Sequence, residues 1–427
     1  MERCKPTPVP LVRLRRPRAT VGRLLILALW GCDTAPSTPD AASPHLEVPL
    51  RDVRVRIVPR AAGVRVRADG PVVVLGNQGN RVGTYPADHW AVLRPEPAGA
   101  LTLDGQTLAA DCVTLVAESG QPLRCAVRED DGWSDAASYA GRLQVCLSGE
   151  GTLEVVNHID VEDYVGSVVA NEVWPTFHAE ALRAQAIAVR TFVLYQAQRR
   201  GDAPYDVIAT QGSQVYRGVR TDTIGRRAVK AAQYTRGIVC TWNDGARDRL
   251  FSTYYSAACG GMTQSAAIFG PEDDIEPLAG GVDCDYCCMA PGKTYRWGPE
   301  TLGADQVLAR LILRSPELGS IDRLVGITAV ERTAGGRLLR LRLEGSSGET
   351  ADLLAERFRV AVGPEVMRST HCDISLDEDE VVFSNGRGFG HGLGLCQWGM
   401  EGQAAAGRRA GEILRYYYPG ARLTRVY

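Results

Sequence analysis

The sequence has no large excess of either charge, no long apolar run and no repeated segment, and these absences exclude whole classes of protein. Its 427 residues carry a formal net charge of −2. A nucleic-acid-binding protein needs a basic face for the phosphates, so we expect no nucleic-acid partner. A membrane-spanning helix needs about twenty apolar residues in a row. None is present, so any membrane attachment has to come from a lipid anchor.

The first part of the chain, residues 1–32, has the layout of an export signal. Basic residues precede an apolar run at 24–30, and a small residue and Cys32 follow. Residues 29–32 resemble a lipoprotein box, in which Cys32 becomes the lipidated first residue of the mature chain. Trp30 stands where that box prefers a small residue, so cleavage by an ordinary signal peptidase is an open alternative. In either case we expect an exported protein of the cell envelope or periplasm.

The chain contains twelve cysteines, and in an oxidising envelope disulfides are their default state. Ten remain when Cys4 and Cys32 are set aside, and an even number suits pairing. A zinc site is the alternative for Cys259 with the C-x-x-C pair Cys284 and Cys287, because thiolates at this spacing can share one metal. No second C-x-x-C and no H-x-x-x-H completes a metal set. We therefore expect disulfides of unknown connectivity and no cofactor, with zinc as the weaker alternative.

Composition divides the rest of the chain into three parts. Residues 33–48 are small, polar and proline-rich, which is typical of a flexible tether. Residues 49–157 alternate apolar with polar side chains between turn residues, which predicts a strand-rich N-terminal region. Residues 158–427 mix both periodicities and form the predicted core. The expected fold class is α+β, with a substrate groove in the core.

Two consecutive helices are the clearest local prediction in the core. Asp160 is a good N-cap, and valines at helical spacing follow it until Pro175 ends the segment. A second helix is predicted over 178–200. The remaining predictions are strands across 205–270, a helix near 303–314, a hairpin at Gly335–Gly336 and a terminal helix at 412–418.

Several ordered motifs carry a family resemblance. They are Val161–Glu172, Glu180–Thr191, Asp206 with Thr210, Ser213–Gly218, Tyr255–Ser256 with Gly260–Gly261, Gly386–Gly399 and Ile413–Gly420. Together they resemble the SpoIID/LytB family, named for stage II sporulation protein D, over roughly residues 140–427. Several motifs in family order are far more specific than any one of them.

The resemblance implies lytic transglycosylase chemistry on peptidoglycan glycan strands that have lost their stem peptides. One carboxylic acid protonates the oxygen of the MurNAc–GlcNAc bond, and its carboxylate then takes the proton of the sugar's own 6-hydroxyl, which leaves a 1,6-anhydro end. The resemblance assigns this role to Glu172. Neighbouring Val168, Val169, Val173 and Trp174 could supply an apolar wall that raises the pKa of the carboxyl. Without the resemblance, Glu172 is a surface glutamate.

The resemblance also implies a set of substrate-binding residues. They are Arg190, Gln185, Ser213, Gln214, His391 and Gln397. Each has a structural alternative: Arg190 could form a salt bridge instead of orienting Glu172 or binding a lactyl carboxylate, and His391 could only stabilise its glycine-rich turn.

The sequence departs from the family pattern in two places. Some family members bind zinc near the Gly260–Gly261 motif through histidines and cysteines, but residues 251–265 contain no histidine. An aromatic residue followed by a basic one is also missing from residues 276–283, although Tyr286 or Lys293 could substitute. These departures keep two rivals open: a non-catalytic protein that binds glycan or modulates a cell-wall amidase, and a structural lipoprotein. The physiological process stays unassigned.

Overall fold

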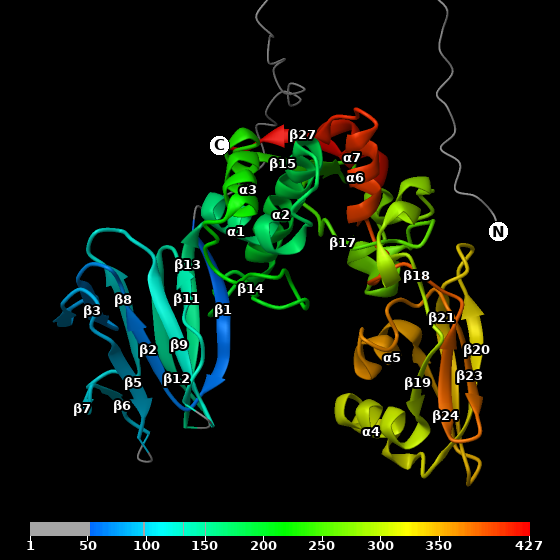
Figure 1. The fold of residues 1–427 in the computed structure, drawn as a ribbon, viewed down its shortest axis with the longest axis horizontal. Helices are drawn as coiled ribbons and strands as arrows, with labels where there is room; N and C mark the ends of the chain where they lie inside the picture. Colours follow the sequence, from blue (N-terminus) through cyan, green and yellow to red (C-terminus); the bar gives the residue numbers. More distant parts are fainter. Residues whose placement is uncertain (1–51, 97–98, 131, 150) are drawn as a thin grey trace, which may run out of the picture.

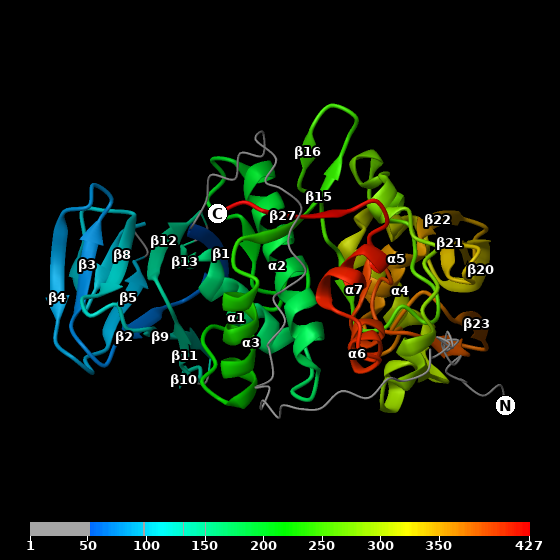
Figure 2. The same cartoon turned by 90° about the horizontal axis from the view of Figure 1, so that it is seen from above.

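The structure is a computed structural model that describes residues 52–96, 99–130, 132–149 and 151–427. The export signal, Cys4, Cys32 and the tether predicted over 33–48 lie outside these residues. Helices and sheets are both abundant, so the predicted α+β class is confirmed. The chain forms three parts that follow one another from left to right in Figure 1 and, from above, in Figure 2.

The first part consists of two sheets that pack face to face. One has the strand order β14-β1-β13-β12-β8-β3-β4, and the other has the order β10-β9-β2-β5-β6-β7 with β11 paired to β9. Alternating valines and leucines from both sheets fill the space between them. The strands are β1 Asp52–Ala61, β2 Val64–Arg67, β3 Val72–Gly76, β4 Arg81–Tyr85, β5 Ala91–Pro95, β6 Leu101–Leu103, β7 Gln106–Thr107, β8 Cys112–Ala117, β9 Leu123–Glu129, β10 Gly132–Trp133, β11 Ala137–Tyr139, β12 Arg142–Ser148, β13 Thr152–Asp160 and β14 Val207–Ile208.

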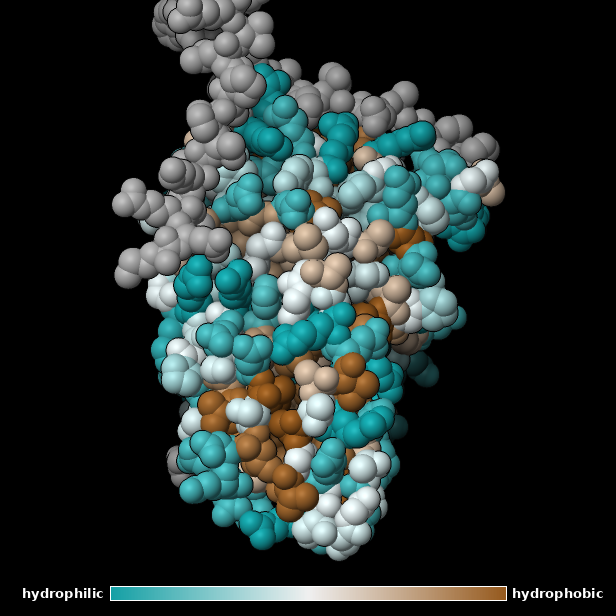
Figure 3. Space-filling model, turned by 90° about the vertical axis from the view of Figure 1, so that its right-hand side faces the viewer, coloured by the Kyte–Doolittle hydropathy of each residue, from teal (hydrophilic) through white to brown (hydrophobic). Residues whose placement is uncertain are grey.

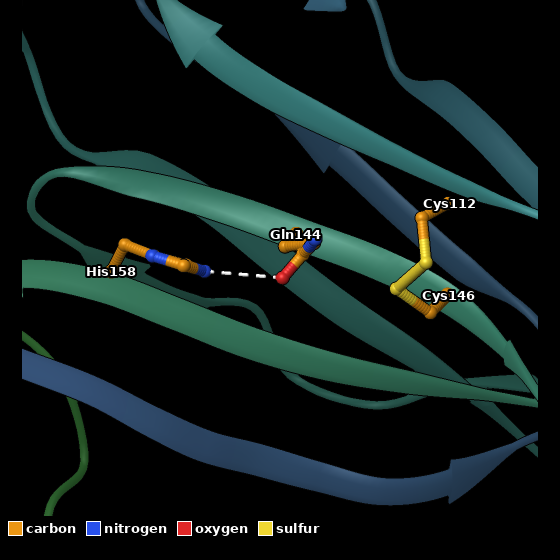
Figure 4. Close-up of a disulfide and its surroundings, with 4 residues drawn as sticks. All are labelled: Cys112, Gln144, Cys146 and His158. Atoms are coloured by element: carbon orange, nitrogen blue, oxygen red, sulfur yellow. Dashed lines mark hydrogen bonds between the residues drawn. A yellow bond between two sulfur atoms is a disulfide. The ribbon is translucent and has the colours of Figure 1, made fainter. Parts of the chain in front are cut away.

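A disulfide joins two neighbouring strands of this part. Cys112 of β8 lies opposite Cys146 of β12 and is bonded to it. Figure 4 shows the bond and, further along β12, Gln144 in contact with His158 of β13. This is the one disulfide among the described residues. The expectation that the cysteines pair throughout the chain is therefore wrong for these residues, because eight other cysteines are not bonded to one another.

The middle part is built around helices. They are α1 Val161–Glu172, α2 Ala179–Arg200, α3 Thr223–Tyr234, α6 Gln397–Ala405 and α7 Ala410–Tyr417, with the strands β15 Ile238–Asn243, β16 Asp248–Arg249, β17 Tyr255–Ser256, β26 Leu395–Cys396 and β27 Arg422–Arg425. The predictions of α1, α2 and α7 are confirmed. Gly166 of α1 lies against α3, where an added Cβ would come within 3.2 Å of Val229. A glycine at this position therefore permits the close packing of the two helices.

The prediction of strands across 205–270 is wrong in the middle of that range. Residues 223–234 form α3 instead of a strand. The helix begins after Asp222, whose carboxylate accepts a hydrogen bond from the Gly225 amide at 3.0 Å. Ile224, Ala228 and Ala231 form its buried side. Their spacing is helical, so the competing helical pattern decides the structure here.

The third part has its own core, formed by two helices and short sheets. Its elements are β18 Arg296–Trp297, β19 Glu300–Gly303, α4 Ala304–Arg314, β20 Leu324–Arg332, β21 Leu338–Gly345, β22 Thr350–Leu354, α5 Ala355–Val362, β23 Asp373–Asp377, β24 Glu380–Ser384 and β25 Gly386–Arg387. Helix α4 and the β20–β21 hairpin confirm the predictions near 303–314 and Gly335–Gly336. Figure 3 shows apolar side chains gathered low on the right-hand face of the molecule, the side that carries β20 and β23 in Figure 1.

Short 3-10 helices fill the segment between the middle and third parts. They are η1 Ala266–Ile268, η2 Pro271–Asp273, η3 Glu276–Leu278, η4 Asp285–Met289 and η5 Gly292–Thr294, and a sixth, η6 Pro316–Ser320, follows α4. The β17–β26 pair is parallel, with Tyr255 opposite Leu395 and Ser256 opposite Cys396. This pairing brings the glycine-rich C-terminal segment back to the middle part, beside α1 and α2.

Candidate functional site

Glu172 is the last residue of α1, and its position follows from the helix ends. The helix begins where the Asp160 carboxylate accepts the Glu162 amide at 2.8 Å, and it stops where Val173 becomes extended two residues before Pro175. The carboxyl therefore lies at the negative end of the helix dipole, which disfavours its ionised form.

Two hydrogen bonds hold the Glu172 carboxyl in place, and Oε1 accepts both. The amide of Val215 donates at 2.7 Å, and the hydroxyl of Tyr255 donates at 3.2 Å. Tyr255 belongs to β17, whereas Gln397 follows directly after its partner strand β26 and also interacts with Glu172. The β17–β26 pair thus brings two distant segments of the chain to one carboxyl.

The pKa of Glu172 is raised above its usual value. Burial is the largest cause, because it removes water from the charged form. The Val215 amide, the Tyr255 hydroxyl, the Gln397 side chain and the Arg217 charge act in the opposite direction, but they do not reverse the shift. The carboxyl consequently keeps its proton at a higher pH than an exposed glutamate does, as a general acid requires.

Arg190 lies in a buried ion pair and not beside Glu172. Its guanidinium, with none of the side chain exposed, donates to both carboxylate oxygens of Glu162 at 2.9 and 2.6 Å. The same guanidinium donates to the carbonyls of Ile238 and Ala232, each at 3.1 Å. The contacts of Arg190 are therefore those of a structural salt bridge, the alternative role that the sequence left open. The structure does not bring Arg190 to the candidate acid Glu172.

Gln185 and Gln214 are both buried in the middle part. Gln214 accepts a hydrogen bond from the Tyr164 hydroxyl at 2.9 Å and lies directly before Val215, whose amide binds Glu172. The side-chain amide of Gln185 makes no hydrogen bond with any described residue, and neither do Nε2 of Gln214 and Nε2 of Gln397. Such buried polar groups are rare unless a ligand or water satisfies them.

Ser213 and His391 line one cleft of about 640 Å³. Tyr254 and Phe269 form its apolar wall, and α4 and α5 contribute charged side chains on the opposite side. The cleft therefore lies between the middle and third parts. Glu172 is not among its lining residues, but Ser213 is two residues before the amide that binds Glu172.

His391 is neutral in this cleft. Burial lowers its pKa to about 4, because the charged ring loses hydration. Its Nδ1 accepts the Leu393 amide at 3.0 Å, so the proton of the neutral ring resides on Nε2. The neutral ring thus carries a single N–H, and a backbone hydrogen bond with Tyr255 also acts on it.

An aromatic surface lies directly beyond Glu172. The ring of Trp174 is 5.8 Å from that of Trp398, and Trp398 packs edge-on against Phe177 at 5.0 Å. Trp174 is 50% exposed, so it does not form the closed apolar wall predicted around Glu172. From the sequence, Trp398 was a candidate for stacking on a sugar face, with core packing favoured, and the structure packs it partly buried against the core of the middle part. Exposed aromatic faces next to a candidate acid suit the flat faces of sugar rings.

Cys259, Cys284 and Cys287 lie together, as the zinc alternative required. Cys396 joins them, and the four Sγ atoms lie within 4.8 Å of one another. All four side chains are buried. The sequence did not predict the fourth member, because Cys396 is more than a hundred residues away and forms no C-x-x-C.

Neither predicted substitute for the aromatic-basic pair reaches Glu172. Lys293 forms an ion pair with Glu300, and the Tyr286 side chain packs against Gly402 of α6. The departure over residues 276–283 is therefore not compensated by these two side chains.

Comparisons with known proteins identify the family. The family model described as stage II sporulation protein, SpoIID, matches residues 149–242. An uncharacterized protein of Brachyspira hyodysenteriae is 31% identical over 293 residues, which are 68% of this chain and 73% of that protein. The chain belongs to the SpoIID family.

Two of the similar proteins have names that describe a role. The stage II sporulation protein D of Bacillus subtilis is 26% identical over 63% of this chain and 76% of its own length. The amidase enhancer of Bacillus subtilis is 27% identical over 60% of this chain, but the match covers only 40% of that longer protein.

The SpoIID match covers the first half of the candidate site. It contains α1 and α2 with Glu172 and Gln185, and it also contains Ser213 and Gln214. His391, Gln397 and the four-cysteine cluster lie outside the matched residues. No helix in the described part of the chain is both long and apolar enough to cross a membrane.

Proposed function

We propose that this protein is a peptidoglycan lytic transglycosylase of the cell envelope with Glu172 as its general acid and base. The observation that carries the proposal is the Glu172 carboxyl, whose pKa is raised by burial while no described cation is paired with it. Membership of the SpoIID family and the names of the two Bacillus relatives support a role at the cell wall.

The proposed reaction needs only this one acid. Glu172 gives its proton to the glycosidic oxygen as the bond from that oxygen to C1 of the muramic sugar breaks. The oxygen of the sugar's own 6-hydroxyl then bonds to C1, and the proton it loses passes to the Glu172 carboxylate. One bond breaks and one forms, no water is consumed, and Glu172 ends protonated as it began.

The surroundings of Glu172 suit a glycan strand. Trp174 and Trp398 offer faces for stacking, and the Gln397 side chain lies beside the proposed acid. The cleft beyond Ser213 supplies the Nε2 proton of His391 and the guanidinium groups of Arg314 and Arg357. An arginine fork matches the lactyl carboxylate of a muramic sugar.

The proposed location is the envelope, reached through the N-terminal export signal. Attachment to the membrane is proposed through a lipid at Cys32 alone. A lipid anchor at Cys32 would hold the chain at the membrane surface, within the envelope where the glycan strands lie.

Product analysis tests the activity. The purified protein is incubated with peptide-stripped glycan strands, and the products are examined by mass spectrometry for anhydro-muramyl ends. Such ends are expected with the parent and with Asp163→Asn, which neutralises an exposed acid on the same helix, but not with Glu172→Gln. Equal yields from Glu172→Gln and the parent would show that another group is the acid.

A non-catalytic role is the second candidate, favoured by the missing aromatic-basic pair and by the relative named amidase enhancer. It predicts that the parent cosediments with glycan strands and produces no anhydro ends. In that case, adding a cell-wall amidase to the same assay distinguishes a modulator, which changes the amidase rate, from a binder, which does not.

A further inference from the structure

The four buried cysteines come from three separate segments and converge on one point. Cys259 belongs to the loop after β17, Cys284 and Cys287 flank the start of η4, and Cys396 ends β26. No described pair among them forms a disulfide: the Sγ atoms of Cys259 and Cys287 are 3.8 Å apart, far beyond a bonded distance of about 2.05 Å.

We propose that Cys259, Cys284, Cys287 and Cys396 bind one zinc ion in a closed tetrahedral site. A zinc–sulfur bond is about 2.3 Å long, which places neighbouring sulfurs of a tetrahedron about 3.8 Å apart. The Cys259–Cys287 separation has this value already, and the other separations do not exceed 4.8 Å. Four thiolate ligands without an open position favour zinc in a structural role. The ligand set contains no histidine.

A buried arginine supplies an independent observation. Arg337 is 1% exposed, and no described carboxylate pairs with it. It donates instead to the carbonyl of Cys259 at 2.6 Å and more weakly to Thr370 and Gly390. An isolated buried cation is strongly unfavourable. A zinc ion with four thiolates carries a net charge of −2, which gives Arg337 a counter-charge in addition to that of Glu356, a carboxylate already paired with Arg359.

The groups around the sulfurs suit thiolates. The amides of Cys259 and Gly399 both point to Sγ of Cys396 at 3.3 Å, and the Tyr417 hydroxyl lies 3.1 Å from Sγ of Cys284. Cys396 is also the N-cap of α6, where the helix dipole favours a negative charge. These contacts form the hydrogen-bonding shell that metal-bound ligands usually have.

A glycine keeps the space for this arrangement. A Cβ on Gly399 would lie 2.5 Å from Sγ of Cys284 and 1.9 Å from the Tyr417 hydroxyl. Any larger residue would therefore displace a proposed ligand and its hydrogen-bond partner together.

The proposed zinc ion would hold together the side of the candidate site that is formed by segments far apart in the sequence. Cys396 precedes Gln397, and its strand pairs with the one that carries Tyr255. Binding one ion would tie β26, the loop after β17 and η4 into a unit, and this unit positions both side chains beside Glu172. The zinc proposal does not depend on the transglycosylase proposal, because the ion is assigned no step in the reaction.

Metal analysis of the purified full chain tests the proposal directly. About one zinc per chain is expected in protein prepared without chelators. Replacing zinc by Co²⁺ should give the intense thiolate-to-cobalt absorption and visible bands of a tetrahedral site. Mapping of the peptides after alkylation in denaturant without reductant should find all four cysteines as thiols, whereas Cys112 and Cys146 stay bonded.

Three substitutions sharpen the test. Cys396→Ser removes a ligand and should abolish stoichiometric zinc, while Cys288→Ser, next to a proposed ligand but outside the cluster, should retain it. Arg337→Met keeps all four sulfurs and should weaken zinc binding about 10- to 100-fold, as expected when an outer contact is lost.

Some results would overturn the proposal. Zinc at background level in the parent, together with disulfides among the four cysteines, would show that the cluster forms two disulfide bonds and not a metal site. Zinc that survives Cys396→Ser unchanged would place the ion elsewhere. If Cys396→Ser does not fold, the zinc content, cobalt spectrum and thiol map of the parent decide the question. Because these readouts do not involve glycan cleavage, they stand apart from any failure of the proposed activity.

Discussion

The two glutamates near the ends of α1, Glu162 and Glu172, have the same side chain but opposite surroundings. Glu162, near the start, accepts two hydrogen bonds from Arg190, one from the Tyr427 hydroxyl at 2.6 Å and one from the Gly237 amide. These contacts lower the pKa of Glu162 although its burial acts to raise it. Glu172, at the end, has no arginine in contact, and burial raises its pKa.

The difference separates an acid with structural contacts from the acid that we propose as reactive. At the start of α1 several donors bind the carboxylate, and that carboxylate joins α1, α2 and the residue Tyr427 after β27. At the end of α1 the protein keeps a carboxyl only partly satisfied and places aromatic side chains beside it. A buried carboxyl with a raised pKa and no ion-pair partner among the described residues favours a functional role for Glu172.

The largest expected effect is on catalysis by Glu172→Gln. Because the amide cannot donate and recover a proton, we expect the rate of anhydro-end formation to fall about 10²- to 10⁴-fold. Single-turnover assays with saturating glycan strands measure this rate. An unchanged melting temperature would confirm that the loss is chemical.

The second expected effect is on stability, at the other end of the helix. Removing one partner of the buried pair, with Glu162→Gln or Arg190→Met, should lower the free energy of unfolding by about 3–5 kcal/mol. The double substitution Glu162→Met with Arg190→Met should recover part of this loss, because no buried charge then remains unpaired. Urea titrations of the three variants measure the coupling. If each single substitution changes stability by less than the uncertainty of the titration, the contrast between the two glutamates is wrong.

A smaller effect concerns the stability of Glu172→Gln at different pH values. The folded pKa of Glu172 is raised, so its ionised form destabilises the fold, and the neutral amide should stabilise it by about 0.5–2 kcal/mol at neutral pH. This gain should fade as the pH falls through the folded pKa and vanish below the unfolded value of about 4.3. For Glu162, whose pKa is lowered, the stabilisation is instead present above about 4.3 and lost as the pH falls further.

The smallest expected effect is that of Tyr255→Phe on the pH profile. The Tyr255 hydroxyl donates to Glu172 and acts to lower its pKa, so its removal should raise that pKa further. Activity requires the protonated acid, and it therefore should persist to a higher pH in the variant, by less than about one unit. A profile of kcat against pH for parent and variant tests the shift. A limb that moves to lower pH would contradict the assigned direction.

Local patterns predicted the helices but not their tertiary partners. Asp160 and the valines after it define α1, and the same kind of signal, Asp222 before apolar residues at helical spacing, was present for α3 and was assigned to strands. The contacts of Arg190 could not be predicted, since its partner is 28 residues earlier on another helix. The fourth cysteine was hidden for the same reason, because Cys396 meets Cys259 across 137 residues.

The middle part, including the surroundings of Glu172, is completed by residues that come late in the chain. Thr241 of β15 bonds to Thr424 of β27 across 183 residues, and Tyr427 reaches Glu162 across 265. Gln397 reaches Glu172 only after β26 has paired with β17. Synthesis proceeds from the N-terminus, and contacts this distant in sequence form slowly. The first two thirds of a nascent chain would therefore carry an unfinished site, and the proposed activity would be withheld until nearly the whole polypeptide has emerged and folded.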